Sequence, residues 1–107
     1  MSDSTSASPG PVPSADDIAA IAPLVGQVVA GPGGAMTDEV GVITGDITVA
    51  TAPLPDGRAV VAVQYTDADE WYLLSGGPVP VPAGGLDELH HEVLELIKKG
   101  GGAEVPR

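Results

Sequence analysis

Two runs of β-branched residues on either side of a proline-rich turn constrain the fold of this chain more than any other feature. Residues 46–52 and 58–66 are rich in valine, isoleucine and threonine, and alternate side chains of each run share one face of a strand. Between the two runs, residues 53–57 end in an Asp-Gly pair, which closes hairpin turns. A further apolar run at 70–75 follows an acidic turn. The sequence therefore predicts an antiparallel meander of three strands.

Helix signals lie on both sides of the meander. Ser14 is a capping residue, and the two aspartates after it suit the first turn of a helix from Ala15 to about Ala22, where Pro23 ends it. Residues 86–99 place leucine, valine and isoleucine on one arc and glutamates opposite, with two lysines in the last turn. The predicted fold class is therefore α+β: an antiparallel meander of three to four strands with a short N-terminal helix and a C-terminal amphipathic helix.

The segments around these elements are less well determined by their pattern. Residues 24–30 fit either a strand, which their paired valines favour, or a further helical turn. Residues 36–39 are predicted as a loop, and residues 40–44 continue the β pattern up to a bend at Gly45. The three prolines of residues 76–82 cannot donate hydrogen bonds within a sheet, so this segment is predicted to be an extended connector or an edge strand.

The chain divides by composition into a central domain and two tails. Its 107 residues allow one domain. We expect residues 1–13, rich in serine, proline and glycine, to form a disordered tail, residues 14–100 a single α+β domain, and residues 101–107 a frayed C-terminal tail. The first residues lack the basic and apolar regions of a secretory signal, and no stretch reaches the roughly 18 apolar residues of a membrane span. A cytoplasmic location is therefore expected.

A large excess of acidic residues excludes several classes of partner. The chain has 15 Asp and Glu against 4 Lys and Arg, a formal net charge of −11. These cations are too few to neutralise nucleic-acid phosphates or to bind an anionic membrane, so neither partner is expected. The favoured interpretation is that the acidic surface serves solubility, with adaptation to salt as a related explanation, and the alternative is that it docks a basic protein partner. The chain also has no cysteine, which excludes disulfides, thiolate catalysis and cysteine-ligated metals.

The two histidines of the chain lie in the C-terminal helical segment, and each has an ordinary and a functional explanation. His90 lies in the apolar arc, where it is either a buried base or, as we favour, a histidine packed at the edge of the core with one nitrogen satisfied. Glu88 and His91 form a Glu-x-x-His pair, but di-iron bundles carry this motif twice, so a solvated helix face is favoured over a metal site. We expect no catalytic residue, no metal and no cofactor.

Both faces of the predicted meander are apolar, which leaves two interpretations open. The adjacent Trp71 and Tyr72 point to opposite faces of a strand, and aliphatic side chains continue on both faces. Either the two helices, or a connector that folds back, cover both faces, or one face stays exposed as a protein–protein interface, most simply between two copies of the chain in a homodimer.

No motif in the chain is specific enough to indicate a known family. The leading functional prediction is a non-enzymatic, small acidic protein-interaction module, which acts as an adaptor, inhibitor or regulator. The alternative, less favoured, is a small-molecule-binding or weakly enzymatic domain with a pocket between the sheet and the C-terminal helix, lined by Trp71, Tyr72 and His90. The candidate interaction residues are Tyr65, Trp71, Tyr72, Leu73, Leu74 and His90.

Overall fold

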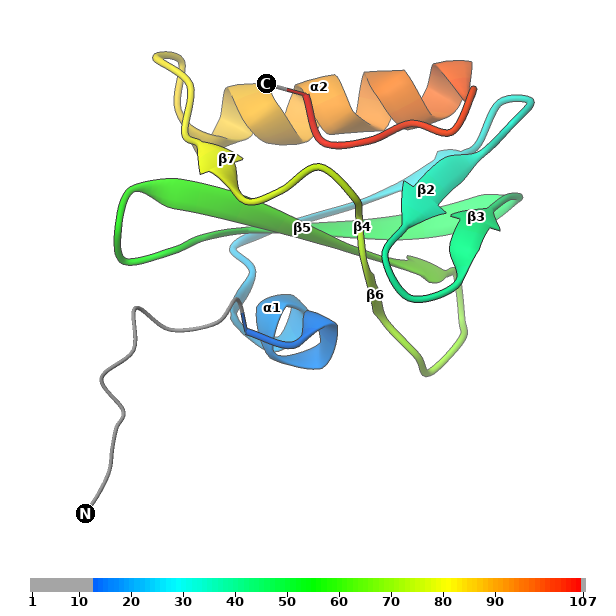
Figure 1. The fold of residues 1–107 in the computed structure, drawn as a ribbon, viewed down its shortest axis with the longest axis horizontal. Coiled ribbons are helices and arrows are strands. Elements are labelled where there is room, and N and C mark those ends of the chain that lie inside the picture. The colour runs from blue at the N-terminus through cyan, green and yellow to red at the C-terminus, as the bar shows by residue number, and fades with distance from the viewer. Residues whose placement is uncertain (1–12, 107) are drawn as a thin grey trace.

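A five-stranded sheet with one helix on each face forms the body of the protein (Figure 1). This computed structural model describes residues 13–106, so the tail predicted at 1–13 lies, apart from its last residue, outside the described residues. The elements in chain order are α1 (Ala15–Ile21), β1 (Leu24–Val29), β2 (Ala35–Thr37), β3 (Gly41–Ile43), β4 (Asp46–Pro53), β5 (Arg58–Tyr65), β6 (Tyr72–Leu73), β7 (Val79–Pro80) and α2 (Leu86–Lys99). The sheet has the order β1-β4-β5-β6, with β7 also paired to β5, and β2 and β3 form a separate hairpin.

The fold class is the predicted α+β, and β4, β5 and β6 form the meander. β4 and β5 pair antiparallel along their whole length around the turn that Leu54 closes. β6 is shorter than the predicted strand at 70–75, because only Tyr72 and Leu73 pair with β5 as a strand. Leu74 forms an isolated bridge with Thr37 of the β2–β3 hairpin. The proline-rich connector supplies β7, so the edge-strand alternative is the one that the structure adopts.

The segment at 24–30, which allowed a strand or a helical turn, forms the strand β1. Ser14 caps α1 as predicted, since its hydroxyl oxygen accepts from the Asp17 N–H at 3.2 Å. Pro23 follows the end of α1, and the backbone after it finds its hydrogen-bond partners in β4 over the full length of β1. Tertiary pairing therefore decides what the local pattern left open.

The β pattern before the meander is divided between two sheets. The loop predicted at 36–39 is wrong at its start, because Ala35–Thr37 form β2 and pair with β3. Gly45 has a φ of 81°, a left-handed conformation that favours glycine, and it turns the chain between β3 and β4. The hairpin of β2 and β3 therefore leaves the plane of the main sheet.

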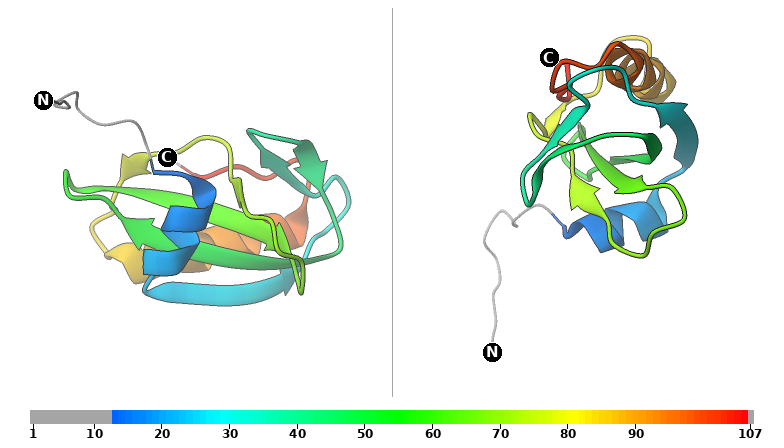
Figure 2. Two further views of the ribbon diagram at one scale, coloured as in Figure 1. Left: turned by 90° about the horizontal axis from the view of Figure 1, so that it is seen from below. Right: turned by 90° about the vertical axis from the view of Figure 1, so that its right-hand side faces the viewer.

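Each face of the central strands is covered by a helix (Figure 2). α2 packs on the face that carries the larger cluster, in which Val49, Val61 and Val93 are fully or almost fully buried. On the other face, α1 packs on β4, β5 and β6. Alanines make up much of this second cluster, so a helix of only two turns comes close enough to bury Ile18 completely. Of the two interpretations of the two-sided apolar pattern, coverage by both helices is therefore confirmed for β4 and β5.

Residues 101–106 do not form the frayed tail that the sequence predicts for 101–107, and Arg107 lies outside the described residues. After α2 the chain turns back along the hairpin, and the Met36 N–H donates to the carbonyl of Ala103 at 2.8 Å. The Val105 N–H donates to the carbonyl of Ser75 at 2.8 Å, and the Val105 side chain is only 3% exposed. Residues 103–106 thus close one side of the core, and burial of two apolar side chains offsets the entropy of ordering this segment.

Candidate interaction surface

The six candidate interaction residues lie in three different environments. Trp71 and Leu73 pack against the cluster under α1, whereas Tyr72 packs against the cluster under α2, so the adjacent rings point to opposite faces as predicted. Leu74 is buried, with 2% exposure. Tyr65 is 42% exposed at the end of β5. Because β6 is an edge strand, both faces remain accessible around its end, and Trp71 and Tyr72 each keep part of their surface in contact with solvent.

His90 lies away from these residues, on α2. Its Nδ1 atom is 2.7 Å from Oγ1 of Thr51 on β4, and the ring is half-buried between helix and sheet. Burial lowers the pKa of His90, the negative charge of Asp87 raises it in part, and His91 lowers it further. This is the packed histidine with one satisfied nitrogen. It shares the α2 face of the sheet, whereas Trp71 lies on the α1 side, so the pocket that would combine Trp71, Tyr72 and His90 is not assembled.

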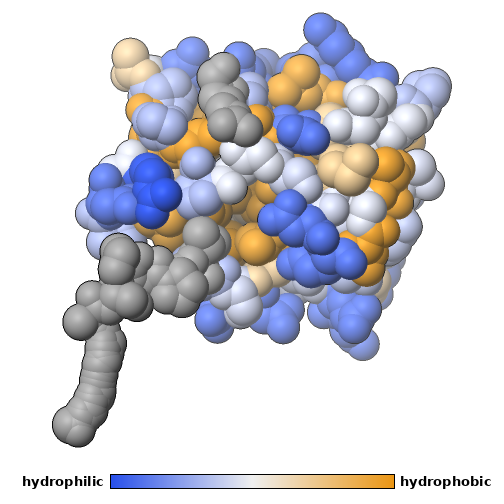
Figure 3. Space-filling view, in the orientation of Figure 1, coloured by the Kyte–Doolittle hydropathy of each residue, from blue (hydrophilic) through white to orange (hydrophobic). Residues whose placement is uncertain are grey.

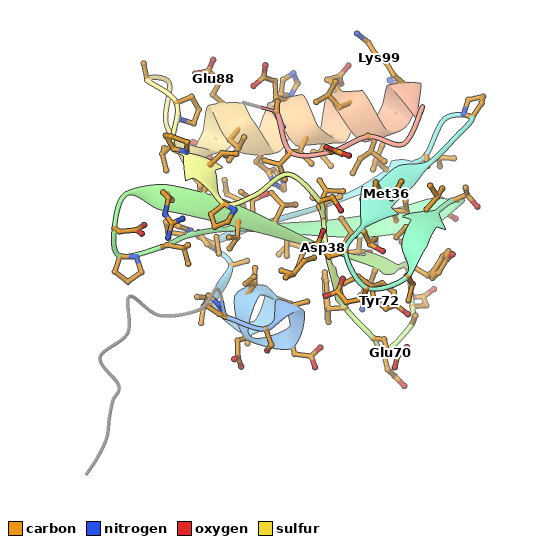
Figure 4. The ribbon with its side chains drawn as sticks, in the orientation of Figure 1. Met36, Asp38, Glu70, Tyr72, Glu88 and Lys99 are labelled. Atoms are coloured by element: carbon orange, nitrogen blue, oxygen red, sulfur yellow. The ribbon has the colours of Figure 1, made fainter. Side chains whose placement is uncertain are left out.

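A shallow depression of about 330 Å³ opens instead at the end of β6, and we call it the acidic–aromatic depression. Three segments that are distant in the sequence supply it: the first turn of α1, the turn between β2 and β3, and the connection from β5 to β6. Figure 4 shows Glu70 and Tyr72 beside Asp38 on this side of the molecule, and Figure 3 shows hydrophilic and hydrophobic surface side by side. The residues that line it are Asp16, Glu39, Asp69, Glu70, Trp71 and Tyr72.

The β2–β3 turn is held against β6 by side-chain carboxylates. Glu39 accepts from the Leu73 N–H with both oxygens, at 2.8 and 3.0 Å. Asp38 accepts from the Ser75 hydroxyl at 2.6 Å, and its own N–H donates to the Leu73 carbonyl at 3.0 Å. Charge-assisted hydrogen bonds to backbone groups are stronger than neutral ones, so they hold the turn in place next to Trp71.

The connection from β5 to β6 places the other two carboxylates. The Ala68 N–H donates to the Tyr65 carbonyl at 2.9 Å, and Asp67 adopts a positive φ of 72°, which closes a tight turn. After this turn the Tyr72 hydroxyl donates to Oε1 of Glu70 at 2.9 Å. This hydrogen bond raises the pKa of the Tyr72 phenol, and the nearby charges of Glu70, Tyr65 and Glu39 raise it too.

The four carboxylates of the depression have no cationic partner within residues 13–106. The only ion pair of this part of the chain joins Arg58 to Asp56 at 2.7 Å, in the turn between β4 and β5. Asp16 and Asp69 are exposed. The depression is therefore a concave, negatively charged surface with aromatic rings in its wall.

The sequence indicated the aromatic part of this surface but not all of its carboxylates. Asp16 appeared as a helix-dipole residue, and Glu39 lay in a predicted loop. Neither residue is close in sequence to Trp71, and no local pattern links the three segments. Only the fold brings them together.

Other kinds of site find no support in the described residues. No group of three or more His, Asp or Glu between residues 13 and 106 is arranged to hold a metal ion. Within the same part of the chain, neither helix is long and apolar enough to cross a membrane. Comparison with protein families, with curated proteins and with solved structures finds no match to this chain.

Proposed function

We propose that this protein is a non-enzymatic interaction module that binds an arginine- or lysine-rich segment of a protein partner in the acidic–aromatic depression. The observation that carries the proposal is the gathering of four carboxylates around partly buried Trp71 and Tyr72, in a hollow that no cation of residues 13–106 neutralises. The module would act as an adaptor, inhibitor or regulator. The proposal includes a cytoplasmic location, because a chain without cysteine does not depend on an oxidising compartment.

The negative charge of the protein would attract a basic partner, and the aromatic rings would hold the partner once it is bound. The net charge of −11 raises the rate of encounter with a basic segment, and this effect weakens as salt screens it. A cation that lies over an aromatic face gains about 0.5–1 kcal/mol at an exposed site. Arginine fits such a surface better than lysine, because its planar guanidinium stacks on a ring and donates to a carboxylate at the same time.

The candidate residues have different parts in this proposal. Trp71 and Tyr72 would contact the partner directly, and Tyr65 would extend the aromatic surface, since it lies on the same face of β5 two residues beyond Val63, the partner of Tyr72. Leu73 and Leu74 would support the rings from below, as expected for side chains that pack in the two clusters. His90 would take no part in binding.

Trp71 is the single tryptophan of the chain, so its fluorescence reports on the depression directly. We would titrate the protein with an arginine-rich peptide, its lysine counterpart and its glutamate counterpart. A saturable fluorescence change is expected with the arginine peptide, a weaker one with lysine and none with glutamate. Absence of any saturable change with the arginine peptide would overturn the proposal.

A matched pair of variants separates the depression from general charge. Asp69→Asn/Glu70→Gln removes two carboxylates of the depression and should weaken binding of the arginine peptide about fivefold, as expected for exposed charge pairs. Glu88→Gln/Glu92→Gln removes the same charge from exposed positions on α2, across the sheet, and should leave the affinity within about twofold. Equal weakening in both variants would mean that only the net charge attracts the peptide.

A further inference from the structure

The strand β1 has an unpaired edge within the described part of the chain. It lies at one end of the sheet order and pairs only with β4. The Ala30 N–H donates to the carbonyl of Gly45 at 2.9 Å, in continuation of the register of β1 and β4. Because alternate residues of an antiparallel pair exchange hydrogen bonds, Val25, Gln27 and Val29 direct their N–H and C=O groups away from the sheet.

The same three residues also expose their side chains. They lie on the sheet face that carries α1, but α1 packs on β4, β5 and β6 and leaves β1 uncovered. Val25 is 59% exposed and Val29 is 64% exposed, and Ile21, which ends α1 just before β1, is 60% exposed. These are the three most exposed large aliphatic side chains of the described residues. The outer edge of β1 is therefore both apolar and rich in unpaired backbone groups.

The stretch of sequence that contains β1 also lacks charge. Residues 18–37 contain no Asp, Glu, Lys, Arg or His, and no other stretch of the chain is as long without charge. Natural edge strands are normally protected by a charged side chain, an internal proline or a bulge. β1 has none of these, and its register with β4 is continuous. In a chain with a net charge of −11, a strand without charges of its own limits the repulsion between two copies at this edge.

We propose that β1 pairs antiparallel with β1 of a second copy, about a two-fold axis at Gln27. In this register Gln27 faces Gln27 of the other copy, and Val25 of each copy faces Val29 of the other. All outward N–H and C=O groups of the three residues then find partners at once. The segment Val25–Val29 is self-complementary in this arrangement, since an amide faces an amide and a valine faces a valine.

The helix α2, which packs beside β1, is also self-complementary about the two-fold axis at Gln27. The Gly31 N–H donates to the carbonyl of Ile97, and a Cβ on Gly26 would lie 3.3 Å from Nε2 of His90, so α2 runs in the same direction as β1. In the proposed pair the two α2 helices are antiparallel. The basic end of each helix, with Lys98, then approaches the acidic end of the other, with Asp87, and this attraction offsets part of the repulsion between the Glu95 side chains beside β1.

A groove beside β1 adds surface to this interface. It has a volume of about 390 Å³ and is lined by Gln27, Val28, Val29, Leu94, Glu95 and Lys98. A stable dimer typically buries about 800 Å² per partner, and a six-residue strand alone falls short of that area. We therefore expect a weak dimer that uses the groove as well as the strand edge. β1 and β6 lie at opposite edges of the sheet, so the acidic–aromatic depression of each copy stays open.

Sedimentation velocity of the full chain tests the association. From about 5 µM to about 500 µM, a range suited to weak specific interfaces, the average mass should rise from 10.6 kDa toward twice that value, and more steeply at high salt. A mass of 10.6 kDa at every concentration and salt would overturn the proposal. Because this result concerns the β1 edge, it leaves peptide binding at the depression unaffected.

A charged side chain introduced at the two-fold axis tests whether the interface lies at β1. Gln27→Lys places two like charges face to face and should weaken association at least about tenfold, although it lowers the net negative charge of the chain. Val42→Lys introduces the same single positive charge at an exposed position of β3, away from the proposed interface, and should leave association unchanged or stronger. Circular dichroism of both variants controls for folding. Undiminished association of Gln27→Lys would show that the interface lies elsewhere.

Disulfide formation between two different variants tests the register, since the natural chain has no cysteine. A mixture of Val25→Cys and Val29→Cys should form mixed disulfide dimers under mild oxidation at least about tenfold faster than either variant alone. Positions 25 and 29 face each other across the axis, whereas two copies of position 25 are four residues apart, beyond the roughly 7 Å between Cα atoms that a disulfide spans. Equal rates in all three samples would contradict the register.

Discussion

The two edges of the sheet end in different ways. At one edge, β1 directs the backbone groups of Val25, Gln27 and Val29 outward, and no charged residue lies near them in the sequence. At the other edge, the outer side of β5 is shared by β6 and β7, and the N–H of Leu73 on β6 is bound by the carboxylate of Glu39. One edge is therefore covered by the chain itself, whereas the other has outward backbone groups without a partner within residues 13–106.

The covered edge shows what protection of a sheet requires. Two segments far from β6 in the sequence take part: the β2–β3 turn and the C-terminal segment, where the Val105 N–H donates to Ser75. Both bring buried or charge-assisted contacts that offset the entropy of ordering them. Among the described residues, β1 has no such segment next to it, and the comparison predicts that side chains at the two edges differ in how much they contribute to stability.

The largest difference in the free energy of unfolding is expected between substitution of a buried valine in the C-terminal segment and of an exposed valine in β1. Val105→Ala should lower the free energy of unfolding by about 2 kcal/mol, because it removes two methyl groups from a nearly closed site. Val29→Ala, at a side chain that is 64% exposed, should change it by less than about 0.5 kcal/mol. Urea denaturation, at a protein concentration too low for self-association, measures the free energy of unfolding of both variants. Similar losses would mean that the C-terminal segment contributes little to the core.

A smaller effect is expected from the carboxylate that covers the edge of β6. Glu39→Ala removes both acceptors of the Leu73 N–H and should cost about 1 kcal/mol, since water can replace part of this exposed hydrogen bond. Glu39→Gln keeps one acceptor and should cost about half as much. Hydrogen exchange at Leu73 should become faster in the order wild type, Glu39→Gln, Glu39→Ala. Unchanged exchange in Glu39→Ala would show that the carboxylate does not protect this edge.

The smallest effect concerns pH and the support of β1 by α2. Burial lowers the folded-state pKa of His90 below its unfolded value of about 6.5, so the unfolded chain binds a proton more readily. Its contribution to stability is complete above the unfolded pKa and is lost as the pH falls through the lowered folded pKa. His90 lies over Gly26, so as the pH falls from about 7.5 to about 5.5 the protection of β1 amides, measured relative to the intrinsic exchange rate at each pH, should drop before that of β5 amides.

Two histidine variants test the origin of this pH dependence. His90→Asn keeps a polar group near Thr51 but does not titrate, so stability over this range should fall less with pH than in the wild type. His91→Asn changes the exposed neighbour and should preserve the wild-type dependence. An identical pH profile for His90→Asn and wild type would assign the dependence to the carboxylates.

Local patterns in the sequence predicted much of the fold. The capped start at Ser14, the stop at Pro23, the Asp-Gly turn between β4 and β5 and the amphipathic helix at 86–99 each depend on interactions within a few residues. Such interactions are readable without the rest of the chain. The packing of His90 was also predictable, because its place in the apolar arc of α2 puts it against the sheet.

Other features depend on contacts between distant segments, and these the sequence alone left undecided or indicated wrongly. The segment 24–30 forms a strand because its backbone hydrogen-bonds to β4 along the whole length of β1. Residues 103–106 pack against the core because glycines 100–102, all with positive φ, turn the chain back so that Val105 is buried. A glycine run of this kind predicts the end of a helix but not the direction that the chain then takes.

The sequence by itself determined the acidic character, the two helices and the central meander, because composition and short-range periodicity control them. Only the tertiary structure decided that both faces of β4 and β5 are covered, that Asp16 and Glu39 join Trp71 in one depression, and that the outer edge of β1 has no partner strand between residues 13 and 106. The physical reason is that burial and strand pairing depend on contacts between two segments. The energy of these contacts cannot be read from the sequence pattern of either segment alone.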